Sequence, residues 1–363
     1  MIPPAQDYAS SRASFLDLVR AAGSVVESHL HPEQGPAGEE LACDVARFGA
    51  PPGDAATVVL ISSGLHGVEG HAGWGLQRLL VESGRLATLK PSIAVVLVHA
   101  VNPFGFAWSR RVDHDNIDVN RNFVDVDHLP ANPRYAEVDS ALNPTADQFD
   151  PDDLSFLAEL QELVDLAGML EAFRVISGGQ YSHPQGVQFG GQHESWSRRT
   201  LERIWADHLP GAVRAVALDI HTGLGPTGRL TVFQTANEDE PAAELGRSWF
   251  PDYLYRADRD EEQATDTGLM GPGFDSWVAA SEDLVADTAA FVIEFGTHDP
   301  IQGVTVFRAD NWLHHHGDPR SDLGVEIRRR MRDFFFIEDE EWRRDVAEQG
   351  MAAITAALDG VGA

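Results

Sequence analysis

Residues 57–70 read TVVLISSGLHGVEG, and this stretch decides the fold class. Its first part, residues 57–62, is a continuous apolar run, which is typical of a strand that is covered on both faces. The run leads into a loop in which glycines surround His66 and Glu69. Glycines around such a pair indicate a backbone that turns sharply or lies close to a ligand. The stretch therefore predicts a buried strand with a histidine and a glutamate just beyond its carboxyl end.

Further apolar runs of strand length follow along the chain. They cover residues 93–99, 213–220 and 289–293, and a helical pattern over about 72–83 separates the first run from the second. A strand–helix–strand unit of this kind predicts parallel pairing. We therefore expect an α/β fold with a mixed, mostly parallel central sheet and helices on both faces.

Helical periodicity predicts the remaining elements. The helical segments are 8–30, 152–171, 194–208, 321–336 and 339–358, and a Gly/Pro/Glu-rich segment at 31–40 follows the first of them. A Pro/Asn-rich stretch indicates a surface insertion, which we place around 125–190. A domain boundary there would divide the candidate site, so residues 1–363 are expected to form a single domain that carries this insertion.

The composition excludes several classes of partner. The chain has 57 acidic and 27 basic residues, a formal net charge of −30, and 43% hydrophobic residues. This is the composition of a folded protein, and a field of that sign repels nucleic acids and anionic lipid surfaces. The acidity favours solubility, with steering of cationic substrates as the functional alternative.

The only cysteine, Cys43, cannot form an intramolecular disulfide, so any metal must be bound by histidines and carboxylates. The N-terminal segment has neither a basic start nor an apolar run, and no stretch is apolar enough to span a bilayer. These features predict a cytoplasmic protein. The oligomeric state is left open.

A histidine or glutamate follows three of the apolar runs. In open parallel sheets, ligands bind at the carboxyl ends of the strands, which is where these residues are expected to lie. These residues are His66 with Glu69, His221 and Glu294. A catalytic zinc takes three nitrogen or oxygen ligands and leaves a fourth position to water. The pattern predicts one zinc per chain, bound by His66, Glu69 and His221. Glu294 directly follows an apolar run, where a carboxylate is costly to desolvate unless a cation lies nearby.

Several motifs, taken in order, resemble the zinc carboxypeptidase superfamily. They are His66-Gly67-Val68-Glu69, NPFGFA at 102–107, Arg110-Arg111, DVNRNF at 118–123, His221 and Glu294. Within that superfamily the chain is similar to a bacterial metallopeptidase-like subgroup described as a domain of unknown function. The segments that carry this closer similarity are 180–186, 219–226, 293–297 and 311–317.

The resemblance implies a zinc carboxypeptidase-like (phosphorylase/hydrolase-like) catalytic domain and a role for each residue. His66, Glu69 and His221 would hold zinc, and Asp118 would support a metal-bound histidine. Glu294 would be the general base, which takes a proton from water and passes it to the leaving amine. The remaining roles fall to arginines and an asparagine. Arg111, or alternatively Arg110, would polarise the scissile carbonyl, and Asn120 with Arg121 would bind a substrate carboxylate.

The chain departs from the digestive carboxypeptidases in one respect. Those enzymes carry an active-site tyrosine roughly twenty residues before the base, whereas no tyrosine lies between Tyr255 and Glu294. Tyr253 and Tyr255 qualify only if an insertion separates them from Glu294. The run His314-His315-His316 is expected to begin a helix or line a rim, because consecutive histidines cannot all face one ion from regular structure.

Three functions remain open at this point. The first is cleavage of an amide or peptide bond next to a free carboxylate, as in a metallocarboxypeptidase. The second is an N-acyl amino acid deacylase of the kind found in the aspartoacylase and succinylglutamate desuccinylase group, which shares the zinc ligands. The third is a non-catalytic zinc-binding module, and it predicts loss of a ligand or of the base, which are all present. A serine hydrolase is not supported, because no Gly-x-Ser-x-Gly occurs.

Overall fold

The computed structural model describes residues 1–145, 149–234, 236, 240–255, 267–281, 284 and 287–362. Within these residues, seven strands form one sheet in the order β1-β2-β4-β3-β5-β7-β6. The strands are β1 (Val26–Gln34), β2 (Glu40–Gly49), β3 (Thr57–Ser63), β4 (Ile93–His99), β5 (Arg214–Thr227), β6 (Leu230–Gln234) and β7 (Asp287–Gly296).

The four central strands, β4, β3, β5 and β7, are parallel. β2 and β6 pair with them antiparallel, and β1 pairs antiparallel with β2. β3 and β4 are buried at every position, because helices cover both faces of the sheet. The predicted fold class, a mixed and mostly parallel sheet between helices, is confirmed.

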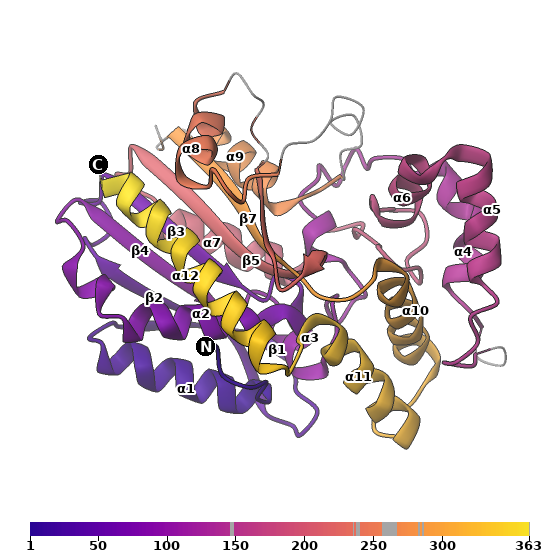
Figure 1. Ribbon diagram of the computed structural model, residues 1–363. Coiled ribbons are helices and arrows are strands. Elements are labelled where there is room, and N and C mark those ends of the chain that lie inside the picture. The colour runs from indigo at the N-terminus through magenta and orange to yellow at the C-terminus, as the bar shows by residue number, and fades with distance from the viewer. Residues whose placement is uncertain are drawn as a thin grey trace.

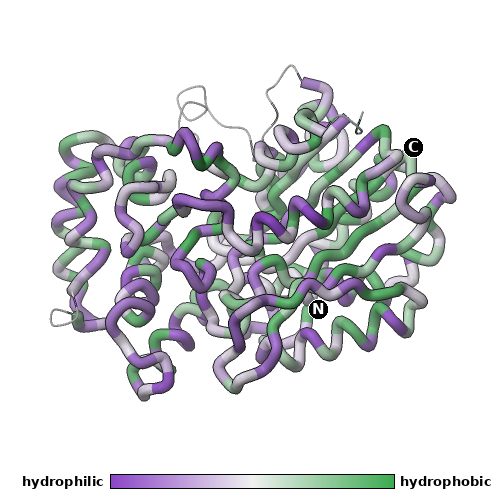
Figure 2. Tube along the Cα trace, turned by 180° about the vertical axis from the view of Figure 1, so that it is seen from behind, coloured by the Kyte–Doolittle hydropathy of each residue, from purple (hydrophilic) through white to green (hydrophobic). Residues whose placement is uncertain are grey.

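The helices of the described residues are α1 (Tyr8–Ala21), α2 (Gly70–Glu82), α3 (Pro103–Trp108), α4 (Asp139–Leu142), α5 (Leu157–Ala167), α6 (Met169–Ser177), α7 (Trp196–His208), α8 (Pro241–Trp249), α9 (Met270–Ala280), α10 (Pro300–His316), α11 (Asp322–Phe335) and α12 (Glu340–Gly362). One face of the sheet packs on α1, α2, α8 and α12, and the other packs on α7 and α9 (Figure 1). Figure 2 shows the strands as a largely hydrophobic layer inside helices of mixed polarity.

The predicted helix over 8–30 is wrong in its second half. α1 ends at Ala21, Gly23 adopts a left-handed φ of +88°, and the chain then enters β1. β1 pairs with β2, which the sequence pattern did not predict. The apparent helical periodicity of 22–30 therefore gives way to strand pairing, which stabilises an extended backbone without needing an apolar stripe.

The segment around 125–190 contains α4, α5 and α6, which build a small hydrophobic cluster of their own outside the sheet layers (Figure 1). Phe307 of α10 packs against this cluster. Residues 146–148 of the segment lie outside the described residues. The insertion and the single domain remain predictions, but the described part of the segment reaches back to the carboxyl edge of the sheet.

The histidine run lies at the end of a helix, not at the start. His314, His315 and His316 form the last turn of α10, which sequence periodicity did not predict. Among the described residues, no helix combines the length and the apolar character that a bilayer crossing requires.

Candidate metal centre

The loop after β3 brings His66 and Glu69 to the carboxyl edge of the sheet. Its short 3-10 helix (Gly67–Glu69) lies against α3 so closely that a Cβ on Gly67 would come within 2.2 Å of the Gly105 carbonyl carbon. Only glycine fits that approach. The last residue of β3, Ser63, is level with Ile220 of β5, so His221 stands just beyond the end of β3 and faces the same loop.

His66, Glu69 and His221 converge in a buried group. One donor atom from each lies within 4.8 Å of the other two. The Glu69 carboxylate joins the histidines, because His66 Nδ1 is 2.8 Å from Oε1 and His221 Nδ1 is 3.0 Å from Oε2. The main-chain N–H of Thr222 also donates to Glu69 Oε2, at 2.9 Å. The structure thus brings together the three predicted metal ligands.

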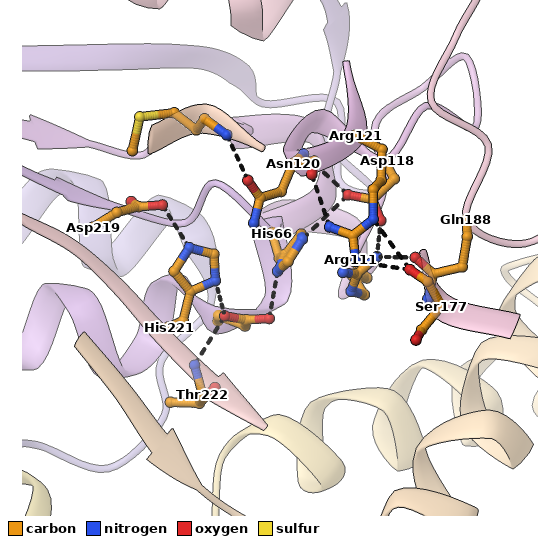
Figure 3. A network of polar contacts seen from close by, with 12 residues as sticks. His66, Arg111, Asp118, Asn120, Arg121, Ser177, Gln188, Asp219, His221 and Thr222 are labelled. Atoms are coloured by element: carbon orange, nitrogen blue, oxygen red, sulfur yellow. Dashed lines mark hydrogen bonds and ion pairs between the residues drawn. The ribbon is translucent and has the colours of Figure 1, made fainter. Parts of the chain in front are cut away.

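The Nε2 atom of each histidine, which lies on the side of the ring away from Glu69, is within hydrogen-bond distance of a second carboxylate. His66 Nε2 lies 3.2 Å from Asp118 Oδ1, and His221 Nε2 lies 2.5 Å from Asp219 Oδ2 (Figure 3). Ser62 Oγ donates to the other oxygen of Asp219, at 2.6 Å. A hydrogen on each Nε2 leaves the Nδ1 lone pairs free to bind a cation, which is the arrangement that supports metal-bound histidines. The donor set therefore fits zinc.

The group is electrostatically coupled. Burial alone would raise the pKa of Glu69, but the charges of His66 and His221 and their hydrogen bonds outweigh it and lower the pKa to about 2. Burial would likewise lower the pKa of His221, yet Asp219 and Glu69 hold it well above the usual value. The site thus keeps Glu69 ionised between two histidines, and it attracts positive charge.

Glu294 lies next to this group on the neighbouring strand. Its Cα pairs with that of His221 in the register of β5 and β7, and its Oε1 accepts the N–H of Leu224 at 2.8 Å. Burial is the main reason that its pKa rises to about 8, and the charge of Glu69 adds to the effect, although His221, the Leu224 N–H and Arg111 oppose it. Glu294 is therefore a buried carboxyl group poised to bind or release a proton near neutral pH.

The two adjacent arginines have different surroundings. Arg111 Nη1 donates to Asp118 Oδ2 and to Gln188 Oε1, and its guanidinium stacks over Phe307 at 5.5 Å. Arg110 instead makes a buried ion pair with Asp310, with Nε 3.0 and 3.1 Å from the two carboxylate oxygens. The structure therefore connects Arg111, and not Arg110, to the predicted metal ligand His66 through Asp118.

The predicted carboxylate-binding pair is only partly open to a ligand. Arg121 donates from Nε and Nη2 to the Ser177 carbonyl, at 3.1 and 2.8 Å, and from Nη1 to the Asn120 carbonyl. The amide oxygen of Asn120 accepts the Met270 N–H at 2.9 Å, while its amide nitrogen has no hydrogen-bond partner in the part of the chain that the structure describes. A role of Arg121 in positioning the loop is thus visible, and its contact with a substrate carboxylate stays a prediction.

A hollow adjoins Arg111. It is small, with a volume of about 20 Å³, and partly open to solvent, and it is lined by residues of the loop after α3, the 125–190 segment and helices α10 and α11. Its apolar lining residues are Val112, Val187, Phe307 and Met331, and its polar ones are Arg111, Asn116, Gln188, Asp310 and Asn311. This space is enough for a water molecule or two beside Arg111.

The candidate tyrosines do not complete the site. Tyr253 packs on the main hydrophobic core, and Tyr255 is exposed beside Phe233 of the edge strand β6. Two other residues were missed from the sequence. Asp219 precedes His221 by two positions, so strand periodicity alone would place both on one face. Gln188 carries no comparable sequence signal, because it reaches Arg111 only through the packing of the 125–190 segment.

Comparison with solved structures shows the fold. The crystal structure of thrombin activatable fibrinolysis inhibitor has a TM-score of 0.51 at 10% identity, over 98% of this chain and 74% of that one. The bovine protein, solved in complex with tick carboxypeptidase inhibitor, has a TM-score of 0.49 at 10% identity, over 98% of this chain and 97% of that one. A putative succinylglutamate desuccinylase/aspartoacylase from Shewanella frigidimarina has a TM-score of 0.36 at 16% identity, over 80% of this chain and 71% of that one.

At such low identities the likeness concerns the fold alone, and only the first of these structures, with its TM-score of 0.51, supports it. A comparison with curated protein sequences gave no match. The profile of the family DUF2817, described as a protein of unknown function, matches residues 5–349. Since this match spans nearly the whole chain, the protein belongs to the DUF2817 family.

Proposed function

We propose that this protein is a zinc-dependent hydrolase that cleaves an amide or peptide bond next to a free carboxylate, as a metallocarboxypeptidase does. The observation that carries the proposal is the convergence of the buried donors of His66, Glu69 and His221 beside the carboxyl group of Glu294. A structural histidine ordinarily forms one ion pair or hydrogen bond with one carboxylate. Here the Nε2 atoms of both histidines contact Asp118 and Asp219, and their Nδ1 atoms both face the carboxylate of Glu69.

His66 Nδ1, His221 Nδ1 and the Glu69 carboxylate would hold the zinc ion. A zinc ion bound in such a site lowers the pKa of a water molecule and polarises a carbonyl group. Asp118 and Asp219 keep the two imidazoles in the tautomer that can bind it, because each accepts a hydrogen bond from Nε2. The ligands are buried, so bulk water has little access to the reacting bond.

Glu294 would accept the proton of the attacking water and pass it to the leaving nitrogen. The Leu224 N–H fixes Oε1 at 2.8 Å, which leaves Oε2 for this work. A nearby cation would favour the ionised form of a carboxyl group whose pKa is raised to about 8 by burial and by Glu69. Arg111 would stabilise the negative charge that develops on the carbonyl oxygen, because its Nε and Nη2 make no hydrogen bond within the described residues.

A second candidate is an N-acyl amino acid deacylase of the aspartoacylase type. The same donors and the same carboxyl group would serve it, because both reactions hydrolyse an amide bond next to a carboxylate. In either case the carboxylate of the substrate would be bound by Asn120, whose amide nitrogen is available, with Arg121 behind it. A panel of N-acyl amino acids and short peptides, each as free acid and as amide, separates the two candidates.

The decisive experiment for the hydrolase is Glu294→Gln. The variant keeps the shape of the side chain and the hydrogen bond from Leu224, so it should retain the fold and zinc. Its turnover should fall by roughly 10²- to 10⁴-fold, the usual contribution of a general base. The exposed Glu162→Gln of α5 is the matched control and should leave turnover unchanged. Wild-type turnover in the zinc-loaded Glu294→Gln protein would refute the mechanism.

A further inference from the structure

Two arginines from the last third of the chain lie over one tryptophan at the end of α3. Trp108 is the last residue of that helix, Arg320 precedes α11, and Arg328 lies within α11. The guanidinium carbons of Arg320 and Arg328 are 5.6 and 5.7 Å from the centre of the Trp108 ring. The face of an indole ring attracts such cations. The three side chains form an arginine–tryptophan cluster that the proposed reaction does not use.

The arginine–tryptophan cluster lies at the edge of the sheet. The indole N–H of Trp108 donates to the Gln34 carbonyl at 3.0 Å, and Arg320 Nη2 is 3.5 Å from the carbonyl oxygen of Pro36. Gln34 ends β1, which is the outermost strand on that side, whereas the predicted metal ligands follow β3 and β5 in the middle of the sheet. The cluster is therefore separate from the candidate metal centre.

Neither arginine of the cluster has a carboxylate partner in the part of the chain that the structure describes. Their recorded side-chain contacts are with the indole ring and, for Arg320, with a main-chain carbonyl. By contrast, Arg329 and Arg330 of the same helix both pair with Glu326. The chain has 57 acidic and only 27 basic residues, so carboxylates are abundant. Two neighbouring positive charges without any of them form a local exception in a strongly acidic protein.

Arg328 is the more costly of the two cations to leave without a counter-ion. Its side chain is partly buried, and its Nε is enclosed without a hydrogen-bond partner among the described residues. Burial lowers the pKa of Arg328, and the charge of Arg320 lowers it further. A partly buried cation beside a like charge is unfavourable until an anion neutralises it. Its Nη1 and Nη2 make no hydrogen bond within the described residues, so they are available to such an anion.

We propose that Arg320 and Arg328 form a binding site for a phosphate group beside Trp108. The paired N–H donors of a guanidinium match the oxygens of a phosphate. A phosphate group carries a charge of about −1.5 to −2 at pH 7, so it neutralises both cations, whereas one carboxylate neutralises only one. Arg320 is exposed, and its side chain can close onto an anion that is bound at Arg328.

The ligand should be a small soluble molecule. The formal net charge of −30 repels an anionic membrane surface, whereas a single phosphate group can enter one local site. The phosphate group belongs either to the free ion or to a phosphate ester, and both present the same oxygens to the arginines. The inference goes beyond the proposed function and does not depend on it.

Isothermal titration calorimetry of the full-length protein with inorganic phosphate, at low ionic strength and pH 7.5, tests the site. Wild type should bind one phosphate per chain. Arg320→Gln and Arg328→Gln should each weaken the affinity by about tenfold, the size expected from one hydrogen bond to a charged group. Arg328→Lys keeps the charge without the planar donors, so it should weaken binding less than Arg328→Gln.

Arg329→Gln is the matched control for the general effect of charge. It removes the same charge from the same helix, but Arg329 is already paired with Glu326 and Asp333. It should therefore leave the phosphate affinity unchanged. Methyl phosphate is the second probe, and it separates the two sources of the phosphate group. Binding as tight as that of inorganic phosphate supports an ester as the ligand, and binding of inorganic phosphate alone supports the free ion.

The proposal is overturned if wild type binds no phosphate in the millimolar range, or if Arg320→Gln and Arg328→Gln both bind it as tightly as wild type. The second outcome includes phosphate that binds at the candidate metal centre, because neither variant touches that centre. An equal loss of affinity in Arg329→Gln would reduce the effect to overall charge and would also overturn the proposal. The hydrolase fails or stands separately, because its test is turnover in Glu294→Gln.

Discussion

Replacement of Asp310 by alanine should destabilise the protein strongly, although Asp310 lies outside the proposed metal-binding group. Its carboxylate accepts Arg110 Nε at 3.0 and 3.1 Å, and both side chains are about 5% exposed. The guanidinium keeps polar contacts with Asn116 and His314, but it loses its only ion-pair partner among the described residues. Removing one member of a buried pair leaves an uncompensated charge, and the free energy of unfolding should fall by about 3–5 kcal/mol.

Urea unfolding followed by circular dichroism measures this change. Asp17→Ala, at an exposed position of α1, is the control and should stay within about 0.5 kcal/mol of wild type. Arg111→Ala should also destabilise the protein, because it removes the arginine paired with the buried Asp118, and it should in addition remove the proposed activity, which Asp310→Ala should not do directly. If the free energy of unfolding of Asp310→Ala lies within about 1 kcal/mol of the wild-type value, the ion pair is not structural, and Arg110 becomes a candidate for the reaction again.

Two further predictions follow from the surroundings of the site. Asp118→Asn and Asp219→Asn should each weaken zinc affinity by roughly 10- to 100-fold, because each removes a carboxylate that orients a proposed ligand histidine. Competition with a chromogenic chelator measures the affinity. Unchanged affinity in both variants would show that the carboxylates do not act on the metal. The pKa of His99 is lowered to about 3, mainly by burial and further by His71 and Arg12, so the unfolded state binds a proton that the folded state does not between about pH 3 and 6.5. Stability should therefore fall as the pH drops through this window, and the loss between pH 7 and pH 5 should be about 2 kcal/mol smaller in His99→Phe than in wild type when urea unfolding is compared at the two pH values. An identical loss in both proteins would mean that His99 is protonated in the folded state.

The central strands could be predicted because each is covered on both faces, which leaves a continuous apolar run in the sequence. β1 lacks such a signal because most of its residues are exposed and it is stabilised by pairing with β2. β2 is largely buried, but the charged residues Asp44 and Arg47 interrupt its apolar run. α10 was missed for a different reason. Its buried residues include Arg308, Asp310 and Asn311, so the side that faces the protein has no apolar stripe for periodicity to detect.

The candidate ligands could be predicted because each follows a recognisable strand, and parallel strands bring such positions to one edge. The two arginines could not be distinguished from sequence, because they are adjacent and only packing decides which one meets Asp310 and which one meets Asp118. The same holds for Gln188. Its contact with Arg111 depends on a left-handed backbone and joins two segments that are 77 residues apart in sequence.

The central claim is that His66, Glu69 and His221 bind one zinc ion, and metal content tests it most directly. The protein and its His66→Ala and His221→Ala variants should be stripped with a chelator, incubated with excess zinc, passed through a desalting column and analysed by mass spectrometry for metals. The exposed His193→Ala serves as the matched control. We predict close to one zinc per chain in wild type and in His193→Ala, and little in the two ligand variants. Stoichiometric zinc in both His66→Ala and His221→Ala, or none in wild type, would contradict the account.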